Sequence, residues 1–107
     1  MNIAIIPARA GSKRVPRKNI RRFNGRPLMT YSIAAALASG CFDRIIVTTE
    51  DPEISDISRE AGAEVPFVRP LELCDDFVGT GPIIRHAVNW LCANGPAPEL
   101  ICCIYAT

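Results

Sequence analysis

Short apolar runs alternate with longer helix-forming stretches along the chain. Residues 3–6 are apolar and residues 44–49 are rich in β-branched side chains, so both predict buried strands, with further strands at 64–68 and 100–105. The stretches 28–38, 52–61 and 80–93 have helical composition or periodicity. This alternation predicts an α/β fold, a Rossmann-like parallel sheet with helices on both faces and ligands at the carboxyl ends of the strands.

Residues at the helix ends support these boundaries. Gly40 and Gly62 follow the first two helical stretches and predict their C-terminal stops. Asp51 is expected to be an N-cap, with Pro52 at the first helical position. Thr80 is likewise predicted to be the N-cap of the last helix.

The composition predicts one globular domain spanning residues 1–107. Apolar residues make up 49% of the chain and charged residues 21%, and no apolar run approaches the ~20 residues of a membrane span. The first residues have no features of a secretion signal, so we expect a cytoplasmic location. The chain stops directly after a strand, where the next loop of such a fold should begin, so we expect it to be part of a longer, truncated domain.

The cysteines predict neither a zinc site nor a disulfide framework. There are five, with no CxxC pair, and the single histidine has no ligand-like spacing to any of them. We expect reduced, mostly buried thiols. His86 is predicted to be a surface residue without a role, and Phe67 and Trp90 are predicted to be packing residues.

A basic loop follows the first strand. The chain has twelve Lys and Arg, and eight of them lie before the first acid, Asp43: Arg9, Lys13, Arg14, Arg17, Lys18, Arg21, Arg22 and Arg26. Small residues in the same loop would let backbone N–H groups approach an anion. The loop therefore predicts a polyphosphate site, with a solvated basic surface as the alternative. A nucleic-acid site is not expected, because only Phe23 interleaves with the charges and the net charge is +1.

The dinucleotide fingerprint and the P-loop motif are both absent. The stretch IIPARAGSKRVPRKN, residues 5–19, instead resembles the N-terminal signature of the sugar-acid cytidylyltransferases, the CMP-N-acylneuraminate synthetase-like family. The segments GRPLMTYSI, IIVTTED and VPFVRPLELCDD extend the resemblance over the whole chain. It implies a fold of the nucleotide-diphospho-sugar transferase type, of which residues 1–107 would be the nucleotide-binding half.

The resemblance also implies the participants in the reaction. CTP and a sugar acid would be the substrates and Mg²⁺ the cofactor, with metal ligands expected in a second half that lies outside this chain. A full-length protein would be a homodimer, without a nucleic-acid or membrane partner, acting in surface glycan biosynthesis.

Within the first loop, Arg9 and Lys18 resemble the family's phosphate-binding pair and are the expected catalytic residues. The resemblance implies a cradle formed by Ala8, Gly11, Ser12 and Lys13. Asn19 would contact the nucleotide.

Three further residues resemble nucleotide contacts. Arg69 corresponds to an arginine near the cytidine, although pairing with Glu72 or Asp76 is the alternative. Thr80 falls where a hydroxyl meets the base, and Asp76 is expected to touch the base edge or to orient its loop. Direct binding of a metal by Asp75 and Asp76 is not expected, because neighbouring loop residues point different ways.

The segment CDDFVGTGPIIRHAV is closer to the pseudaminic acid branch of the family than to the sialic acid branch. The terminal CIYAT agrees, because the sialic acid branch typically ends this strand with Leu-Gln-Pro-Thr. The expected function is activation of a nonulosonic acid, pseudaminic acid first, with CTP to give the CMP-sugar and pyrophosphate. CMP-N-acetylneuraminate or legionaminate synthesis, or an incomplete nucleotide-binding fragment, are the alternatives, and this chain alone is expected to be inactive.

Overall fold

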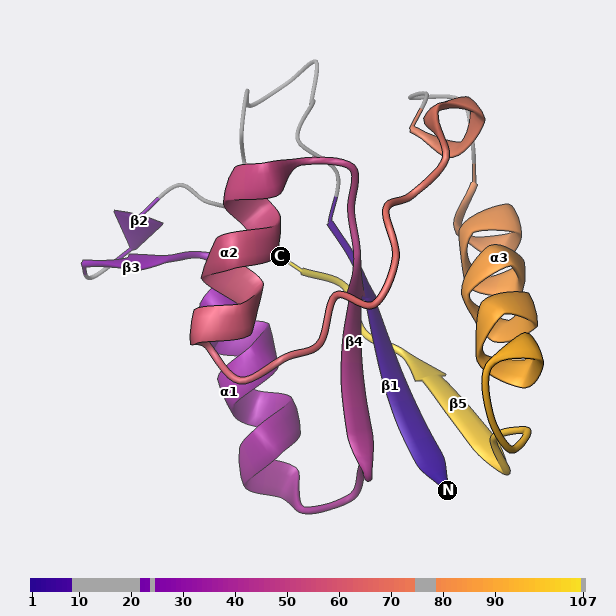
Figure 1. Cartoon of the computed structure of the whole chain (residues 1–107). Helices are drawn as coiled ribbons and strands as arrows, with labels where there is room; N and C mark the ends of the chain where they lie inside the picture. The colour runs from indigo at the N-terminus through magenta and orange to yellow at the C-terminus, as the bar shows by residue number, and fades with distance from the viewer. Residues whose placement is uncertain (9–21, 24, 75–78, 107) are drawn as a thin grey trace.

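The structure is a three-stranded parallel sheet between helices, with a small hairpin to one side (Figure 1). The computed structural model describes residues 1–8, 22–23, 25–74 and 79–106. In chain order the elements are β1 (Asn2–Pro7), β2 (Arg22–Phe23), β3 (Arg26–Pro27), α1 (Met29–Ser39), β4 (Arg44–Thr48), α2 (Pro52–Glu60), the 3-10 helix η2 (Leu71–Leu73), α3 (Thr80–Ala93) and β5 (Leu100–Cys103).

The sheet has the order β4-β1-β5, and both pairings are parallel. Ile5 of β1 lies opposite Ile46 on one side and Cys103 on the other. Because all three strands run the same way, their carboxyl ends meet at one edge of the sheet. The predicted parallel α/β architecture is confirmed.

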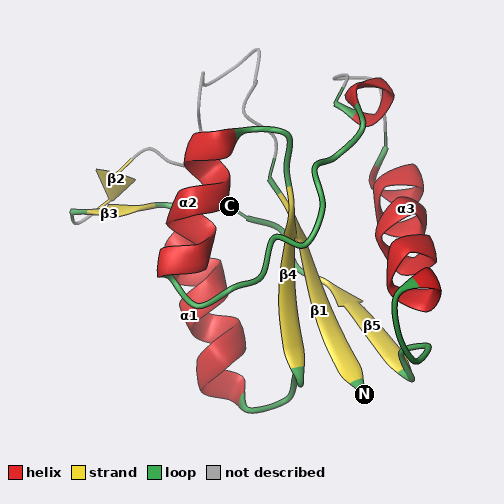
Figure 2. Ribbon diagram, viewed as in Figure 1, coloured by secondary structure: helices red, strands yellow, loops and turns green. Residues whose placement is uncertain are grey.

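Helices cover both faces of the sheet, α1 and α2 on one and α3 on the other (Figure 2). Side chains alternate along β1, so Ala4 and Ile6 pack toward α1 and α2, whereas Ile3 and Ile5 pack toward α3. All four are at most 1% exposed. The continuous apolar run at residues 3–6 of β1 is therefore explained by two separate cores, one on each face of the sheet.

The helix boundaries agree closely with those predicted. Gly40 has the left-handed φ of 67° that favours glycine at a helix C-terminus, and Gly62, after α2, has a φ of 104°. The Asp51 carboxylate accepts a hydrogen bond from the Ile54 N–H at 3.0 Å, so Asp51 is the predicted N-cap. Pro52 follows it as the first residue of α2.

The prediction of a strand at residues 64–68 is wrong. Only Glu64 forms a bridge, in parallel with Ile46, and Glu64 exchanges backbone hydrogen bonds of 2.8 and 2.9 Å with Ile45 and Val47. Pro66 has no N–H to continue the ladder. The predicted strand 100–105 is also shorter, ending at Cys103, although the Ile104 N–H still donates to the Ile5 carbonyl.

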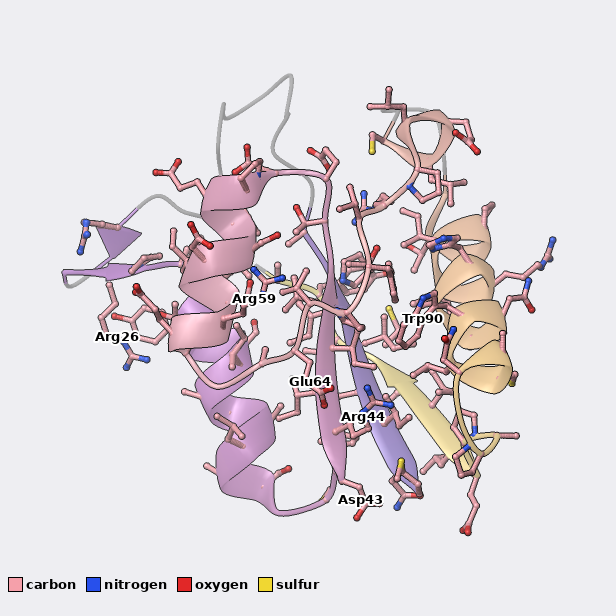
Figure 3. The ribbon with its side chains drawn as sticks, in the orientation of Figure 1. Arg26, Asp43, Arg44, Arg59, Glu64 and Trp90 are labelled. Carbon is pink, nitrogen blue, oxygen red and sulfur yellow. The ribbon has the colours of Figure 1, made fainter. Side chains whose placement is uncertain are left out.

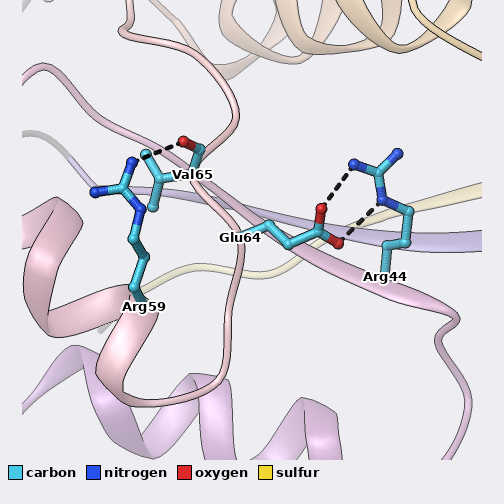
Figure 4. Close-up of polar contacts among 4 residues, drawn as sticks. All are labelled: Arg44, Arg59, Glu64 and Val65. Carbon is cyan, nitrogen blue, oxygen red and sulfur yellow. Dashed lines mark hydrogen bonds and ion pairs between the residues drawn. The ribbon is translucent and has the colours of Figure 1, made fainter.

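Side chains tie this bridge to its surroundings (Figure 4). Arg44 donates from Nε and Nη2 to the two carboxylate oxygens of Glu64, at 3.0 and 2.8 Å. Arg59 of α2 donates to the Val65 carbonyl at 3.0 Å. The segment after α2 is therefore held to β4 and to α2.

The hairpin of β2 and β3 lies in a stretch predicted to have no regular structure. Its turn contains Gly25, with a φ of 80°, and Arg22 Nη1 donates to the Gly25 carbonyl at 2.7 Å. Arg22 is paired with Pro27 in an antiparallel register. Two-residue strands of this kind give no hydrophobic period that a sequence pattern could reveal.

The environments of several single residues differ from prediction. All five cysteines are free as expected, but Cys41, Cys92 and Cys103 are exposed, so the expectation of mostly buried thiols is wrong. His86 is half-buried and meets the Phe67 ring edge-on at 5.0 Å, so it is not a plain surface residue. Phe67 and Trp90 pack against the core under α3, as predicted (Figure 3).

Among the described residues, no helix is long and apolar enough to cross a bilayer.

Candidate functional site

Segments from three strands converge at the carboxyl edge of the sheet. Ala8 follows β1, Thr49 follows β4, and the stretch 104–106 follows β5. Arg69 joins them from the segment after α2, because its N–H donates to the Thr49 carbonyl at 3.0 Å. This is the edge at which open parallel sheets bind ligands.

Thr48, the last residue of β4, connects two of the predicted site residues. Its carbonyl accepts a hydrogen bond from the Ala8 N–H at 3.0 Å and another from Arg69 Nη2 at 2.6 Å. Its hydroxyl accepts from Arg69 Nε at 3.2 Å. Ala8, which precedes the basic loop, and Arg69 are far apart in sequence but are both hydrogen-bonded to Thr48.

The Arg69 side chain is buried, with 2% of its surface exposed. A buried charged group is stable only when hydrogen bonds replace its lost hydration. The two bonds to Thr48 serve this purpose. Asp76, one of the two acids that the sequence offered as partners of Arg69, lies outside the described residues. Arg69 therefore supports the sheet edge with its guanidinium and contributes positive charge beneath it.

The turn after Arg69 brings a thiol and a carboxylate close together. The Cys74 thiol donates to the Pro70 carbonyl at 3.3 Å. Partial burial raises the pKa of Cys74, and the neighbouring Glu50 carboxylate raises that pKa further. A raised pKa lowers the thiolate fraction of Cys74, whose observed contact is the hydrogen bond to the Pro70 carbonyl.

Helix α1 anchors the chain where it leaves β5. The Ser32 hydroxyl lies 3.0 Å from the Tyr105 carbonyl and 3.1 Å from the Ala106 carbonyl, and donates toward both. Ala106 is 5% exposed and packs into the core under α1 and α2, whereas Tyr105 is 68% exposed. The backbone that borders the carboxyl edge beyond β5 is thus held in place.

The structure describes three of the predicted site residues, Ala8, Arg69 and Thr80, and brings the first two together through Thr48. Sequence reasoning missed Thr48 and Ser32. A threonine ending a β-branched strand was the available signal for Thr48, whereas nothing in the sequence pairs Ser32 with the chain after β5. The other predicted residues lie outside the described part of the chain: Arg9, Gly11, Ser12, Lys13, Lys18, Asn19 and Asp76.

Thr80 is not the N-cap that the sequence predicted. It is the first residue of α3, and Gly79 occupies the cap position without a side-chain hydrogen bond. The helix thus begins one residue earlier than predicted, with a glycine that has no side chain at the cap position. The Thr80 side chain is therefore not committed to a capping bond.

The expected Mg²⁺ finds no ready site in the part of the chain that the structure describes. Among residues 1–8, 22–23, 25–74 and 79–106, no group of three or more His, Cys, Asp or Glu side chains could hold a metal ion. We derive no chemical step through a metal for these residues.

Comparison with known proteins identifies relatives over nearly the whole chain. The sequence model of the cytidylyltransferase family matches residues 3–76. Pseudaminic acid cytidylyltransferase of Campylobacter jejuni (serotype O:2) is 44% identical over 106 residues, covering 99% of this chain and 46% of that protein. CMP-N,N'-diacetyllegionaminic acid synthase of Legionella pneumophila is 43% identical over 89 residues, covering 83% of this chain and 37% of that protein.

A solved structure shares the fold. The CMP:2-keto-3-deoxy-manno-octonic acid synthetase, solved in complex with CTP, superposes with a TM-score of 0.78 at 21% identity over 98% of this chain and 39% of its own. The chain spans less than half the length of these curated relatives.

Proposed function

Because this chain belongs to the cytidylyltransferase family, we propose that it forms the CTP-binding part of an enzyme that activates a sugar acid. The coarse function follows from the family. The assignment of the residues, the sugar acid and the turnover belongs to this proposal.

The basic loop would hold the triphosphate. Arg9 and Lys18 supply charge to the phosphates, and Gly11, Ser12 and Lys13 supply backbone and side-chain donors around them. Charge-assisted hydrogen bonds of this kind are roughly twice as strong as neutral ones. Asn19, Asp76 and Thr80 would contact the nucleoside, with Ala8 at the entrance of the loop.

The reaction would form one P–O bond and break another. The anomeric hydroxyl oxygen of the sugar acid attacks the α-phosphorus of CTP, and the bridging bond to the β-phosphate breaks, so that pyrophosphate leaves with the bonding electrons. The hydroxyl proton is released to solvent. Negative charge grows on the leaving phosphate and on the oxygens around the α-phosphorus, which is where Arg9 and Lys18 would stabilise it.

One observation carries the proposal. The Thr48 carbonyl accepts hydrogen bonds from both Ala8 and Arg69, at the carboxyl edge of a parallel sheet. This arrangement attaches Ala8, from which the basic loop continues, to the same carbonyl as Arg69, at the edge where open parallel sheets bind ligands.

Pseudaminic acid is the proposed acceptor. The supporting observation is the 44% identity to a pseudaminic acid cytidylyltransferase over 99% of this chain, against 83% coverage for the legionaminic acid synthase. Legionaminic acid and N-acetylneuraminate are the alternatives, as is a fragment that binds the nucleotide without turnover. A full-length protein is proposed to be a cytoplasmic homodimer that uses Mg²⁺.

Two assays on the same preparation test this function. Calorimetric titration with CTP measures nucleotide binding, with ATP as the control nucleotide. Coupled detection of pyrophosphate, with and without Mg²⁺, compares pseudaminic, legionaminic and N-acetylneuraminic acids. We expect CTP to bind in preference to ATP, and pseudaminic acid to be the best acceptor wherever pyrophosphate is released.

The outcomes separate the alternatives. Binding of CTP without pyrophosphate release from any of the three acids is the expected result for residues 1–107 alone. The three acids are then compared with a full-length protein, where absence of pyrophosphate would refute turnover. Absence of CTP binding would refute the proposed function altogether.

A further inference from the structure

A hollow on the outer flank of the molecule is separate from the carboxyl edge. It is an open hollow with a volume of about 360 Å³, lined by residues of the β2–β3 hairpin, α1 and the C-terminal part of α2. Ile57 and Glu60 of α2, and the C-cap Ala61, lie toward the end of the helix that is remote from the carboxyl end of β4. Figure 3 shows Arg26 at this flank, on the side of α1 and α2 that faces away from the sheet.

Two arginines of the hairpin line the hollow, and each is held by a contact of its own. Arg22 donates from Nη1 to the Gly25 carbonyl at 2.7 Å. The Arg26 guanidinium lies over the Tyr31 ring, 4.7 Å from its centroid. Both side chains are therefore oriented, and toward the described residues most of their N–H donors make no hydrogen bond.

The positive charge of these arginines is not neutralised within the part of the chain described. There, no acid lies within ion-pair distance of Arg22 or Arg26. Glu60 lines the same hollow and is exposed, so the lining carries two positive charges and one negative charge. A single anionic group on the ligand balances that set.

Part of the lining of the hollow is apolar. Ile57, Ala61 and Pro27 are half-buried, and they offer carbon surface. Thr30 is buried, and its hydroxyl donates to the Pro27 carbonyl at 2.7 Å. This hydroxyl therefore does not need a hydrogen-bond acceptor on a ligand. A bound molecule thus meets cations at one side, carbon beneath it and an acceptor carboxylate at Glu60.

We propose that this hollow binds a small organic monocarboxylate that has an apolar body and a hydrogen-bond donor. The planar guanidinium fork of arginine matches a carboxylate in a bidentate arrangement. The volume falls in the range of roughly 300–1,000 Å³ that small-molecule sites occupy. Glu60 accepts from the donor and repels a second negative charge, which selects against phosphate dianions and nucleotides and keeps this site distinct from a CTP site.

The test uses 4-hydroxybenzoate, a compact carboxylate with an apolar ring and a phenolic donor. Titration of the ¹⁵N-labelled chain, followed by amide chemical shifts, is expected to give saturable changes at the hairpin and at residues 57–61 at millimolar concentrations. The neutral isostere 4-hydroxybenzamide and inorganic phosphate are expected to give none there. Shifts from all three compounds alike, or none with 4-hydroxybenzoate, would refute the site.

Matched variants assign the contacts. Arg22→Gln and Arg26→Gln are each expected to weaken 4-hydroxybenzoate binding at least about tenfold, because each removes a charge-assisted contact. Arg85→Gln removes an exposed arginine from α3, on the opposite face of the sheet, and is expected to leave binding unchanged. Glu60→Gln is expected to admit phosphate.

Circular dichroism melting of each variant separates lost binding from lost folding, and Arg22→Lys keeps the charge if Arg22→Gln unfolds the hairpin. Equal binding by the Arg22, Arg26 and Arg85 variants would overturn the proposal. Neither Ala8 nor Arg69 lines this hollow. CTP titration of the same variants therefore separates the two sites: weaker 4-hydroxybenzoate binding with unchanged CTP binding assigns Arg22 and Arg26 to the hollow alone.

Discussion

Arg69 occupies a position that few charged side chains tolerate. It is 2% exposed, and two of its hydrogen bonds run to the backbone carbonyl and the hydroxyl of Thr48. Removing a buried group of this kind deletes bonds of the charge-assisted class and leaves a cavity. Its main contribution is therefore to hold the sheet edge on which the basic loop begins.

We expect Arg69→Ala to lower the free energy of unfolding by about 2–4 kcal/mol. Urea denaturation measures the change. Arg59→Ala is the matched control, because Arg59 is exposed, with one hydrogen bond to the Val65 carbonyl and an exposed ion pair with Asp56 at 3.8 Å, and should lose less than about 1 kcal/mol. Equal losses in the two variants would show that Arg69 is not structurally important.

The basic loop makes a separate prediction at the scale of single residues. Arg9→Ala and Lys18→Ala should each weaken CTP binding by roughly 1.5–3 kcal/mol, the range for a hydrogen bond to a charged group. Calorimetry with CTP measures this, and Arg85→Ala provides an exposed arginine outside the loop as the control. Unchanged CTP affinity in both loop variants would remove the loop from the proposed mechanism.

At the scale of elements, the strand–helix pattern was predictable because each main strand is buried on two faces or carries β-branched residues, and each helix has a recognisable end. Asp51 with Pro52, and Gly40, are local signals that need no tertiary contact. The wrong predictions concern segments whose secondary structure depends on tertiary contacts. Glu64 forms a bridge because it lies beside Ile46 of β4, and Pro66 then ends the pairing.

Only part of the candidate site could be predicted from local sequence patterns. A basic, glycine-containing loop after a strand indicates an anion site by its composition alone. The bond from Arg69 to Thr48 depends on how the segment after α2 returns along β4, which no local pattern contains. The hairpin of β2 and β3 is likewise too short to produce a period in the sequence.

The attachment of Glu64 to Arg44 predicts a pH dependence. The hydrogen bond and charge of Arg44 lower the pKa of the Glu64 carboxyl below its ordinary value. A carboxyl with a lowered pKa in the folded state contributes stability above its unfolded pKa, and that stability is lost as the pH falls through the folded pKa. Glu64 is 47% exposed, so solvent screening keeps the contribution small.

We therefore expect Glu64→Gln to reduce stability by less than about 1 kcal/mol at neutral pH and by a vanishing amount near pH 3. Urea denaturation at the two pH values measures the difference. In an Arg44→Met background the same substitution should have no pH-dependent effect. A difference that persists there would mean that Arg44 is not its cause.

At the scale of the whole molecule, one central strand serves two cores. β1 supplies Ala4 and Ile6 to the side of α1 and α2, and Ile3 and Ile5 to the side of α3. The cysteines are distributed around this framework rather than within it. Three are exposed, and Cys74 and Cys102 are half-buried.

This distribution predicts the order of thiol modification. Cys41 and Cys92 should react first with a chromogenic disulfide reagent at neutral pH. Partial desolvation and the neighbouring Cys102 raise the pKa of Cys103, which should therefore react later although it is exposed. Cys74 and Cys102 should react last, and all five should react at once in urea. Mass spectrometry of labelled peptides identifies the order, and early labelling of Cys74 would contradict it.

The two donors on the Thr48 carbonyl have a consequence for cooperativity. Because Ala8 and Arg69 share one acceptor, loosening of the Arg69 segment also removes a constraint on the first residue beyond β1. Amide hydrogen exchange at Ala8 should then accelerate in Arg69→Ala by more than exchange at Ile5, deep in the same strand. The loop entrance and the segment after α2 would open and close as one unit, so that order gained at either would be shared by both.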